Sequence, residues 1–427
     1  MLRVIESGQS REFLNELFDR TTTDYKEIYK VVEGIIENVK KNGDDAVKEY
    51  TERFDGVKLD SIEVTGREIE EAVARVDSDL LETIRKSYNN IKDYHKRQLR
   101  ESTTYKPNGK NIILGQLVNP IEKAGIYVPG GKAAYPSTVL MNAVPAKLAG
   151  VEEVIMITPP NKEGKIQDSI LAAASISGVD RIFKVGGAQG IAALAYGTES
   201  IPKVFKITGP GNIYVAAAKK MVSDFVGIDM IAGPSEILVI ADKSSNPRYI
   251  AADLISQAEH DEMAASILVT DSPSLIRNVN IELKKITDTL ERKDIILKSL
   301  TTYGAAIHTN GLQESIDITN EIAPEHLEIA TVNPFEDYKK IKNAGAIFLG
   351  NYTPEPVGDY FAGPNHTLPT SSTAKFSSPL SVDDFIKKTS LIYYSRDALE
   401  ATKDDIIRFA ENEGLTGHAN SIKIRFE

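Results

Sequence analysis

The chain has 427 residues, a formal net charge of −11, 41% hydrophobic and 26% charged residues, and no cysteine. That length exceeds what one hydrophobic core usually holds, so we expect more than one domain in a protein of ordinary globular composition. The missing cysteines exclude disulfides, iron–sulfur clusters and cysteine-ligated zinc, and the acidic balance argues against a general nucleic-acid-binding protein.

The sequence gives no reason to expect a targeting or membrane segment. Its first residues hold no apolar stretch of signal-peptide length, and no apolar run approaches the roughly 18 residues that cross a bilayer. We therefore expect a cytoplasmic protein that acts without a membrane partner.

The stretch up to about residue 110 is charged and is predicted to be mostly helical. Thr65 and Glu68 have the spacing of a capping box, in which the two side chains satisfy the first free N–H groups of a helix. We expect a helix to begin there.

A different texture begins near residue 124, where short apolar runs alternate with alanine-rich helical segments. Helices are predicted at Thr138–Leu148, Ile191–Tyr196 and Tyr214–Met221. The predicted strands are Gly125–Val128, Val154–Ile157, Ile182–Val185 and Val204–Ile207. Because these strands are apolar on both faces and alternate with helices, they indicate βαβ units around a buried parallel sheet.

A second series follows a turn at Gly233-Pro234, with a helix predicted to begin near Pro247. Its predicted strands are Glu236–Ala241, Ala265–Thr270, Ala305–His308, Leu327–Val332 and Ala346–Leu349. Beyond about residue 380 the chain returns to a polar, helical texture. The sequence therefore predicts an α/β fold with two Rossmann-like, parallel-sheet units, seams near residues 125 and 234, and helical extensions at both ends.

Four loops rich in glycine and proline lie at the ends of predicted strands: Val128–Gly131, Gly186–Gly190, Gly209–Asn212 and Ala232–Ser235. Ligands of open α/β sheets bind at the carboxyl ends of strands, so we expect these loops to share one crevice. The loop ending at Asn212 leads into a helix whose free N–H groups could hold a phosphate, and Asn212 or Gln189 could add hydrogen bonds. Both the Gly-x-Gly-x-x-Gly fingerprint and the Walker A motif are absent, so simple turns are the alternative.

Five of the six histidines occur in the last 170 residues, and four of these, His260, His326, His366 and His418, have polar and turn-rich surroundings. Gln257 and His260 are three residues apart, so both would project from one face of a helix. Asp359 and His418 lie in turn-rich segments, and each could complete a nitrogen–oxygen coordination sphere for zinc. Capping or surface roles are the alternative, because ligands so far apart in sequence cannot be paired by spacing.

Glu325 and His326 place a carboxylate beside an imidazole at the entry to a predicted strand. Histidine titrates near neutrality and a carboxylate can take a proton from water, so the pair suits acid–base catalysis. Successive side chains of a strand point to opposite faces, so both reach one site only if the chain turns at Ala323-Pro324. A solvated glutamate beside a hydrogen-bonded histidine is the alternative.

Taken in chain order, these motifs resemble the histidinol dehydrogenase family, and the resemblance spans nearly the whole chain. The segments that carry it are Ala124–Gly131, Gly209–Asn212, Ala232–Glu236, Gln257–His260, Ala323–Leu327, Gly363–His366 and Glu413–His418. No single motif is decisive, but the ordered set is specific.

The resemblance implies an intertwined homodimer that binds NAD and zinc. It implies a zinc and substrate domain of residues 1–125 and 234–380, an NAD domain of residues 126–233 and a dimerisation tail of residues 381–427. The implied zinc ligands are Gln257, His260, Asp359 and His418, of which His418 reaches across from the other subunit. Glu325 and His326 are implied as the acid–base pair, and Tyr127, Gln189 and Asn212 as the NAD contacts. The implied substrate contacts are Ser235, Gln257, His260, His326, Asp359, His366, Glu413 and His418.

The implied reaction oxidises L-histidinol to L-histidine through L-histidinaldehyde, the last steps of histidine biosynthesis, and reduces two NAD molecules. Zinc would position the amino alcohol, His326 would accept its proton, and Glu325 would activate water for the second oxidation. Because the chain lacks cysteine, the second oxidation should proceed through a hydrated aldehyde and not through a thioester. A zinc-dependent hydrolase and a non-catalytic nucleotide-binding module are the alternatives, and NAD-dependent turnover distinguishes them.

Overall fold

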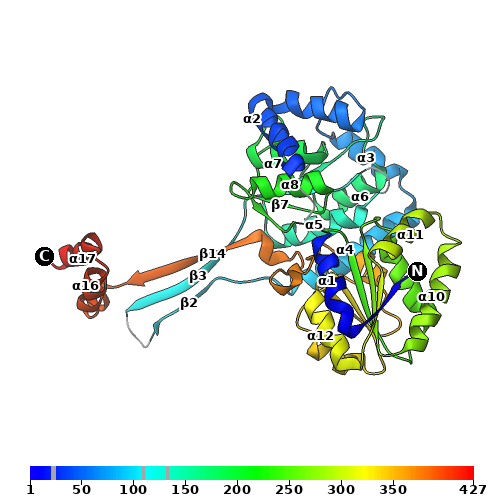
Figure 1. Ribbon diagram of the computed structural model, residues 1–427. Coiled ribbons are helices and arrows are strands. Elements are labelled where there is room, and N and C mark those ends of the chain that lie inside the picture. Colours follow the sequence, from blue (N-terminus) through cyan, green and yellow to red (C-terminus); the bar gives the residue numbers. More distant parts are fainter. Residues whose placement is uncertain (21–25, 108–110, 131–133, 232) are drawn as a thin grey trace. The chain divides into compact units, whose positions relative to one another are not determined.

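The computed structural model describes residues 1–20, 26–107, 111–130, 134–231 and 233–427 (Figure 1). The chain forms two compact units, the first made of residues 1–98 and 122–385 and the second of residues 99–121 and 386–427. Within the described residues, no helix has both the length and the apolar composition needed to cross a membrane.

The first unit holds a five-stranded parallel sheet in the order β6-β5-β4-β7-β8. Its strands are β4 (Lys123–Tyr127), β5 (Glu153–Thr158), β6 (Arg181–Lys184), β7 (Lys206–Thr208) and β8 (Gly227–Ile228), and its helices are α5 (Pro136–Ala149), α6 (Asp168–Ser177), α7 (Gly187–Tyr196) and α8 (Ile213–Val222). The four strands predicted between residues 125 and 207 are all present. The last of them begins at Lys206, two residues later than predicted.

A six-stranded parallel sheet in the same unit has the order β1-β11-β10-β9-β12-β13. Its strands are β1 (Arg3–Glu6), β9 (Glu236–Ala241), β10 (Ala265–Thr270), β11 (Ala305–His308), β12 (His326–Ala330) and β13 (Ala346–Leu349). The helices of this part are α1 (Ser10–Asp19), α9 (Pro247–Ala258), α10 (Pro273–Thr287), α11 (Lys293–Thr302), α12 (Leu312–Ile322), α13 (Pro334–Asp337) and α14 (Glu355–Tyr360).

Alternating side chains of β9 build a core on each face of this sheet. Ile237 and Val239 pack with residues of α9, α10 and α11, whereas Leu238 and Ile240 pack with residues of α1 and α12. Every residue of β9 is buried, as a central parallel strand covered by helices on both faces requires.

The two sheets share one strand order. In each, the first strand of the series (β4 or β9) lies in the interior, with the next two strands added on one side and the following two on the other. This is the order of a Rossmann-like half, and the switch point lies between β4 and β7 in one sheet and between β9 and β12 in the other. The predicted class, two Rossmann-like parallel-sheet α/β units, is therefore confirmed.

The N-terminal stretch contributes to both sheets. As predicted, it is mostly helical. Its long helices are α2 (Lys26–Asp55), which is kinked at Gly43, α3 (Gly66–Arg75) and α4 (Ser78–Lys96). The Thr65 and Glu68 side chains cap α3 reciprocally, as predicted. Buried residues of α2 pack in one core with α7 and α8 of the five-stranded sheet, whereas β1, which the sequence reasoning missed, extends the six-stranded sheet. The domain boundaries inferred from the resemblance stay a prediction.

The second unit is built on an antiparallel sheet in the order β14-β3-β2. It consists of β2 (Thr103–Tyr105), β3 (Ile112–Pro120) and β14 (Ile386–Tyr394), followed by α15 (Arg396–Glu400), α16 (Lys403–Asn412) and α17 (Thr416–Lys423). The prediction of a helical tail from residue 380 was wrong for its first part, which is the strand β14. That strand mixes lysines with apolar residues and pairs with β3, which lies far earlier in the chain, so local periodicity does not reveal it.

Candidate active site

A cavity of about 280 Å³ in the first unit collects most of the predicted site residues. It is bordered by the loops after β4 and β7 and by residues that precede or begin β9 and β12. The predicted residues that line it are Asn212, Ser235, Gln257, His260, Glu325, His326, Asp359 and His366. Segments far apart in sequence are thus brought to one place.

Three of the four glycine- and proline-rich loops contribute to this cavity, through Pro129, Pro210–Asn212 and Ser235. The fourth, Gly186–Gly190, instead lines a second cavity of about 820 Å³, together with Tyr127, Gln189 and Asn212. Gly131 and Ala232, which belong to the predicted loops, lie outside the described residues. Because Asn212 lines both cavities, the expected single crevice is a pair of neighbouring cavities.

The loop after β7 is fixed by a buried ion pair. Lys219 pairs with Asp229 and also donates to the carbonyl oxygen of Gly209 at 3.0 Å, while the Gly209 N–H donates to Asp229 at 2.8 Å. Gly209 has a φ of 112°, and a Cβ there would collide with the carbonyl oxygen of Tyr127. Only glycine therefore lets this loop approach β4 so closely. Asn212 then caps α8 by accepting from the N–H groups of Tyr214 and Val215.

The chain turns just before β12, as the acid–base hypothesis required. Ala323 adopts the left-handed conformation with a φ of 51° at the end of α12, and Glu325 precedes the strand that begins at His326. Both side chains are buried and line the same cavity, with Glu325 Oε2 3.7 Å from His326 Nδ1. Because Glu325 lies in the turn and not in the strand, the alternation of side chains along a strand does not separate it from His326.

The hydrogen bonds of His326 define which nitrogen is free. Its Nδ1 donates to the carbonyl oxygen of Glu236 at 3.0 Å, because a carbonyl can only accept. Its buried Nε2 has no hydrogen-bond partner among the described residues. The nearest carboxylate oxygens are Asp359 Oδ1 at 3.7 Å and Glu355 Oε1 at 3.9 Å. Nε2 is therefore the atom that can exchange a proton with a ligand in the cavity.

Both members of the pair have shifted pKa values. Burial raises the pKa of Glu325 to about 8, although His326 and the N–H of Glu236, 2.9 Å from Glu325 Oε2, act against the rise. Burial alone would lower the pKa of His326, but the carboxylates of Glu325, Glu355 and Asp359 together raise it to about 10. Two titratable groups shifted in this way mark a candidate catalytic site.

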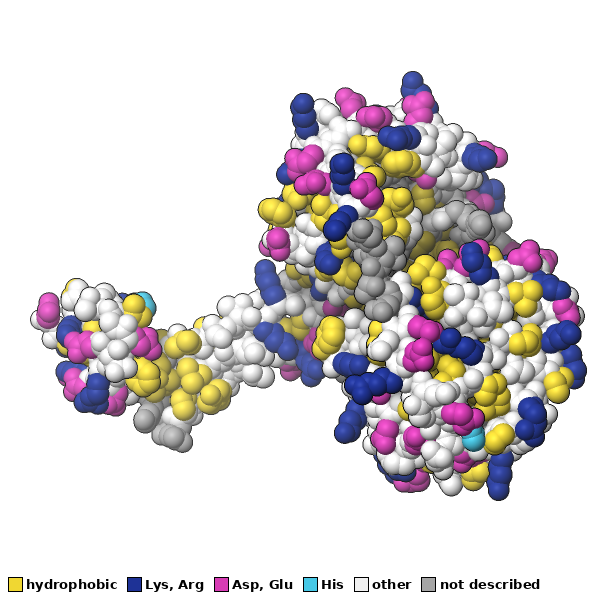
Figure 2. Space-filling model, in the orientation of Figure 1, with side chains coloured by type: hydrophobic (Ala, Val, Ile, Leu, Met, Phe, Trp, Pro, Cys, Tyr) yellow, Lys and Arg dark blue, Asp and Glu magenta, His cyan; other side chains and the backbone are white. Residues whose placement is uncertain are grey.

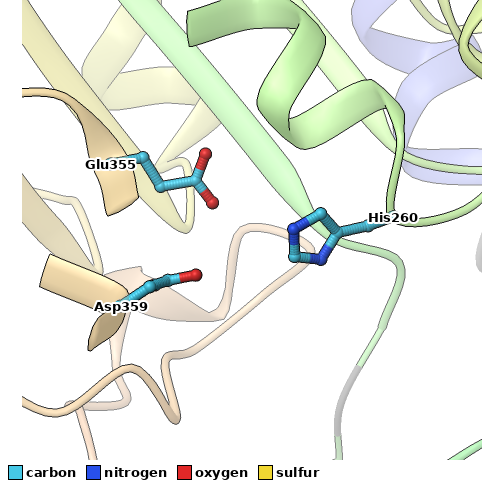
Figure 3. A group of neighbouring side chains, drawn as sticks. All are labelled: His260, Glu355 and Asp359. Atoms are coloured by element: carbon cyan, nitrogen blue, oxygen red, sulfur yellow. The ribbon is translucent and has the colours of Figure 1, made fainter. Parts of the chain in front are cut away.

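His260, Glu355 and Asp359 form a candidate metal site (Figure 3). One ligand atom from each can be chosen so that all three lie within 4.8 Å of one another, and the side chains converge from α14 and from the turn after α9. A donor set of one imidazole and two carboxylates suits zinc. The buried Gln257 adjoins the group: its amide nitrogen, when turned toward Glu355, donates to both carboxylate oxygens at 2.5 and 3.1 Å.

Glu355 is the member of the candidate metal site that sequence reasoning missed. Its backbone N–H donates to Glu328 Oε1 at 2.9 Å, and its carboxylate accepts from Ser256 Oγ at 2.9 Å, so it is held firmly at the start of α14. Burial raises its pKa. The available signal was the four-residue spacing from Asp359, which places both carboxylates on one face of a helix.

His366 and Ser235 complete the described wall of the cavity. His366 Nδ1 donates to the carbonyl oxygen of Asp359 at 3.1 Å, and its Nε2 lies 3.4 Å from Thr138 Oγ1. Burial lowers the pKa of His366, so its imidazole stays neutral near pH 7. The carbonyl oxygen of Ser235 accepts from the N–H of Ala265 at 3.0 Å, which ties the backbone of this cavity-lining residue to the start of β10.

The residues predicted to contact NAD lie at the second cavity. The Tyr127 hydroxyl accepts from the N–H of Gly187 at 3.2 Å, and burial raises the Tyr127 pKa to about 12. Gln189 is buried on α7, and its Oε1 has no partner within the part of the chain that the structure describes. These groups can serve a polar ligand, but the NAD assignment stays a prediction.

Glu413 and His418 belong to the second compact unit, where Glu413 follows α16 and His418 lies on α17. Both are exposed in this unit. Their part in the site stays a prediction.

Comparison with known proteins places the chain among close relatives. It matches the model of the histidinol dehydrogenase family over residues 18–426. It is 56% identical over 430 residues to a histidinol dehydrogenase of Clostridium acetobutylicum, which covers 100% of this chain and 99% of that protein. A histidinol dehydrogenase of Lactococcus lactis is 51% identical, with 100% of both chains covered. The crystal structure of histidinol dehydrogenase from Elizabethkingia anophelis matches with a TM-score of 0.90 at 38% identity, over 94% of this chain and 92% of that one.

Proposed function

Since this chain belongs to the histidinol dehydrogenase family, we propose that it oxidises L-histidinol to L-histidine through L-histidinaldehyde, with NAD as hydride acceptor and zinc as bound metal. One observation carries the proposal: a single cavity brings the Glu325–His326 pair, the group His260, Glu355 and Asp359, and the loop residue Asn212 together. A proton acceptor, a metal-ligating group and a route to a nucleotide cavity are the parts that this oxidation needs.

His326 acts as the base of the first oxidation. Its Nδ1 is committed to the carbonyl oxygen of Glu236, so Nε2 can take the hydroxyl proton of the alcohol. Hydride then leaves the same carbon for the nicotinamide ring, and the products are aldehyde and NADH. A positioned base of this kind contributes about 10² to 10⁴ to a rate.

Glu325 acts in the second oxidation. Once its carboxyl group is ionised, it can take a proton from water while the water oxygen bonds to the aldehyde carbon and the aldehyde oxygen takes the proton that His326 holds, which gives a hydrated aldehyde. A second hydride leaves that carbon for a second NAD as His326 again takes a hydroxyl proton, and loss of the remaining acidic proton to solvent leaves the carboxylate of histidine. The chain contains no cysteine to form a covalent intermediate, so the water route is the one its own residues support.

The donor chemistry of the site fits zinc, with His260 and Asp359 as ligands from this subunit. Gln257 can contribute its oxygen if its amide turns away from the arrangement that donates to Glu355. When bound, zinc would hold the amine and imidazole nitrogens of the substrate and offset the carboxylate charge that raises the pKa of His326. The fourth ligand proposed, His418, would come from the partner chain.

We also infer a homodimer in which Glu413 and His418 of one subunit serve the site of the other. The second unit supports this by its surface. Ile392, Phe409 and Tyr105 are 70%, 73% and 61% exposed, and Figure 2 shows hydrophobic side chains gathered on this unit. Apolar surface of this extent is typical of a protein–protein interface, so a second copy of the chain is the proposed cover.

Removal of the metal tests the proposed function. Treatment with a chelator should abolish NADH formation from L-histidinol, and added Zn²⁺ should restore it, because the substrate loses its template. Asp359→Asn and His418→Asn should each weaken zinc binding by about 100-fold or more, measured by metal analysis after dialysis. The control is Asp224→Asn, a change of the same kind at an exposed carboxylate. Full activity in protein shown to be free of metal would contradict the proposal.

A further inference from the structure

The second cavity contains acceptor atoms that the fold does not use. Its wall is formed by the first and the last turns of α2, on either side of the kink at Gly43, and by the segments after β4, β5, β6 and β7. Asp55 and Gln189 both line it, and Asp55 Oδ2 and Gln189 Oε1 are shielded from solvent without a hydrogen-bond partner among the described residues. Unpaired buried acceptors are costly, so each indicates a donor supplied by a ligand.

An aromatic surface lies beside these acceptors. Phe54 is 52% exposed although it stacks on Tyr50, with ring centroids 5.6 Å apart and an angle of 9° between the planes. Val31 and Tyr214 border the same cavity and are also exposed. A planar ring open on one face in a cavity of about 820 Å³ suits a stacked base.

The position of the cavity fixes which part of a dinucleotide would enter it. Asn212 borders both this cavity and the one that contains His326. A dinucleotide that crosses Asn212 with its nicotinamide toward His326 therefore places its adenosine half in the second cavity.

We propose that Asp55 binds the 2′- and 3′-hydroxyls of the adenosine ribose and thereby makes the protein select NAD over NADP. The inference rests on the proposed NAD dependence. A carboxylate only accepts hydrogen bonds, and a ribose diol supplies two donors. The 2′-phosphate of NADP supplies none and adds negative charge next to Asp55.

The electrostatics of the cavity agree with this role. Burial raises the pKa of Asp55 to about 6, which shows that the fold itself does little to stabilise its charge. Two hydroxyl donors would lower that pKa again. Lys30 and Arg53 also border the cavity and could attract a phosphate, so the choice between the two dinucleotides depends on which group meets the 2′ position.

The experiment compares the wild-type protein with Asp55→Asn. We measure kcat and KM for NAD and for NADP in L-histidinol oxidation, and the binding of ADP-ribose and of its 2′-phosphate by calorimetry. The wild type should bind ADP-ribose at least about 100-fold more tightly than the 2′-phosphate. Asp55→Asn should weaken the binding of NAD and of ADP-ribose by about tenfold or more. It should reduce the preference for NAD over NADP by about 100-fold, and the effect should appear in KM rather than in kcat.

Two controls separate this role from a structural one. Glu52→Gln changes an exposed carboxylate of the same helix that does not line the cavity. This variant should leave the preference for NAD over NADP unchanged. Because Asp55 Oδ2 has no partner in the described structure, neither Asp55→Asn nor Asp55→Ser should lower the melting temperature. A large fall in both variants would make Asp55 a structural residue and overturn the inference.

The remaining outcomes distinguish the inference from the proposed function. If Asp55→Asn keeps the preference for NAD over NADP and still oxidises L-histidinol with NAD, the role of Asp55 is overturned and the proposed function stands. Binding of ADP-ribose that depends on Asp55, in a wild-type protein that oxidises L-histidinol with neither dinucleotide, would support the subsite and contradict the function.

Discussion

His326→Asn is expected to lower kcat by about 10² to 10⁴ in both oxidations, measured separately with L-histidinol and with L-histidinaldehyde. The asparagine amide can keep the hydrogen bond that Nδ1 donates to the carbonyl oxygen of Glu236, but it has no atom at the position of Nε2. The loss therefore reports the missing proton acceptor and not a displaced strand. Both steps suffer because each releases a hydroxyl proton as hydride leaves.

The control for this variant is His308→Asn, which removes a histidine at the β1–β11 edge of the same sheet, where it contacts Glu6. That change should leave both rates within a few-fold of the wild type. Zinc content and thermal stability should match across all three proteins. A loss of less than about tenfold in His326→Asn would remove His326 from its proposed place as the base.

Glu325→Gln is expected to reduce the aldehyde step by about 100-fold and the alcohol step by less than about tenfold. The glutamine keeps the shape of the side chain, and its oxygen can still accept from the N–H of Glu236, which lies 2.9 Å from Glu325 Oε2. It cannot take a proton from water. Equal losses in the two half-reactions would contradict the water-activating role, and Glu321→Gln, at an exposed position of α12, is the matched control.

The same variant should change the pH profile of the aldehyde step. Burial raises the pKa of Glu325 to about 8, so most of this carboxyl group is protonated at pH 7 and becomes a base as the pH rises. In the zinc-loaded wild type, where the metal offsets the carboxylate charge that raises the pKa of His326, the rate should therefore increase through this range and level off above it. In Glu325→Gln that increase should disappear.

Much of the fold could be predicted because burial on both faces of a parallel sheet leaves a clear hydrophobic pattern in the sequence. The interior strands β9, β10 and β11 have the predicted limits, since a parallel strand buried on both faces is a continuous apolar run between polar loops, and the edge strand β13 also has its predicted limits. The strands missed were β1, β2, β3, β8 and β14, which lie at a sheet edge or in the small antiparallel sheet. Their pairing partners are distant in sequence or their residues are mixed, so no local period marks them.

Many residues that line the cavity could be picked out from the sequence, but their geometry could not. Gln257 and His260 both line it, although His260 lies in the turn beyond α9 and not on the helix, and the chain turns at Ala323 as expected. Glu355 was missed because a glutamate after a proline reads as the start of a turn, and its burial depends on contacts with Ser256 and Glu328. Only the folded chain brings such groups together, and the contribution of Glu413 and His418 depends further on a second chain.

The measurement that tests the central claim most directly is the number of NADH molecules formed per L-histidinol consumed by the zinc-loaded protein. Four-electron oxidation through a hydrated aldehyde predicts two NADH per substrate, with histidine as product and no aldehyde released. One NADH with accumulating aldehyde would contradict the second step and the role of Glu325. No NADH at all would contradict the dehydrogenase and bring forward the zinc hydrolase.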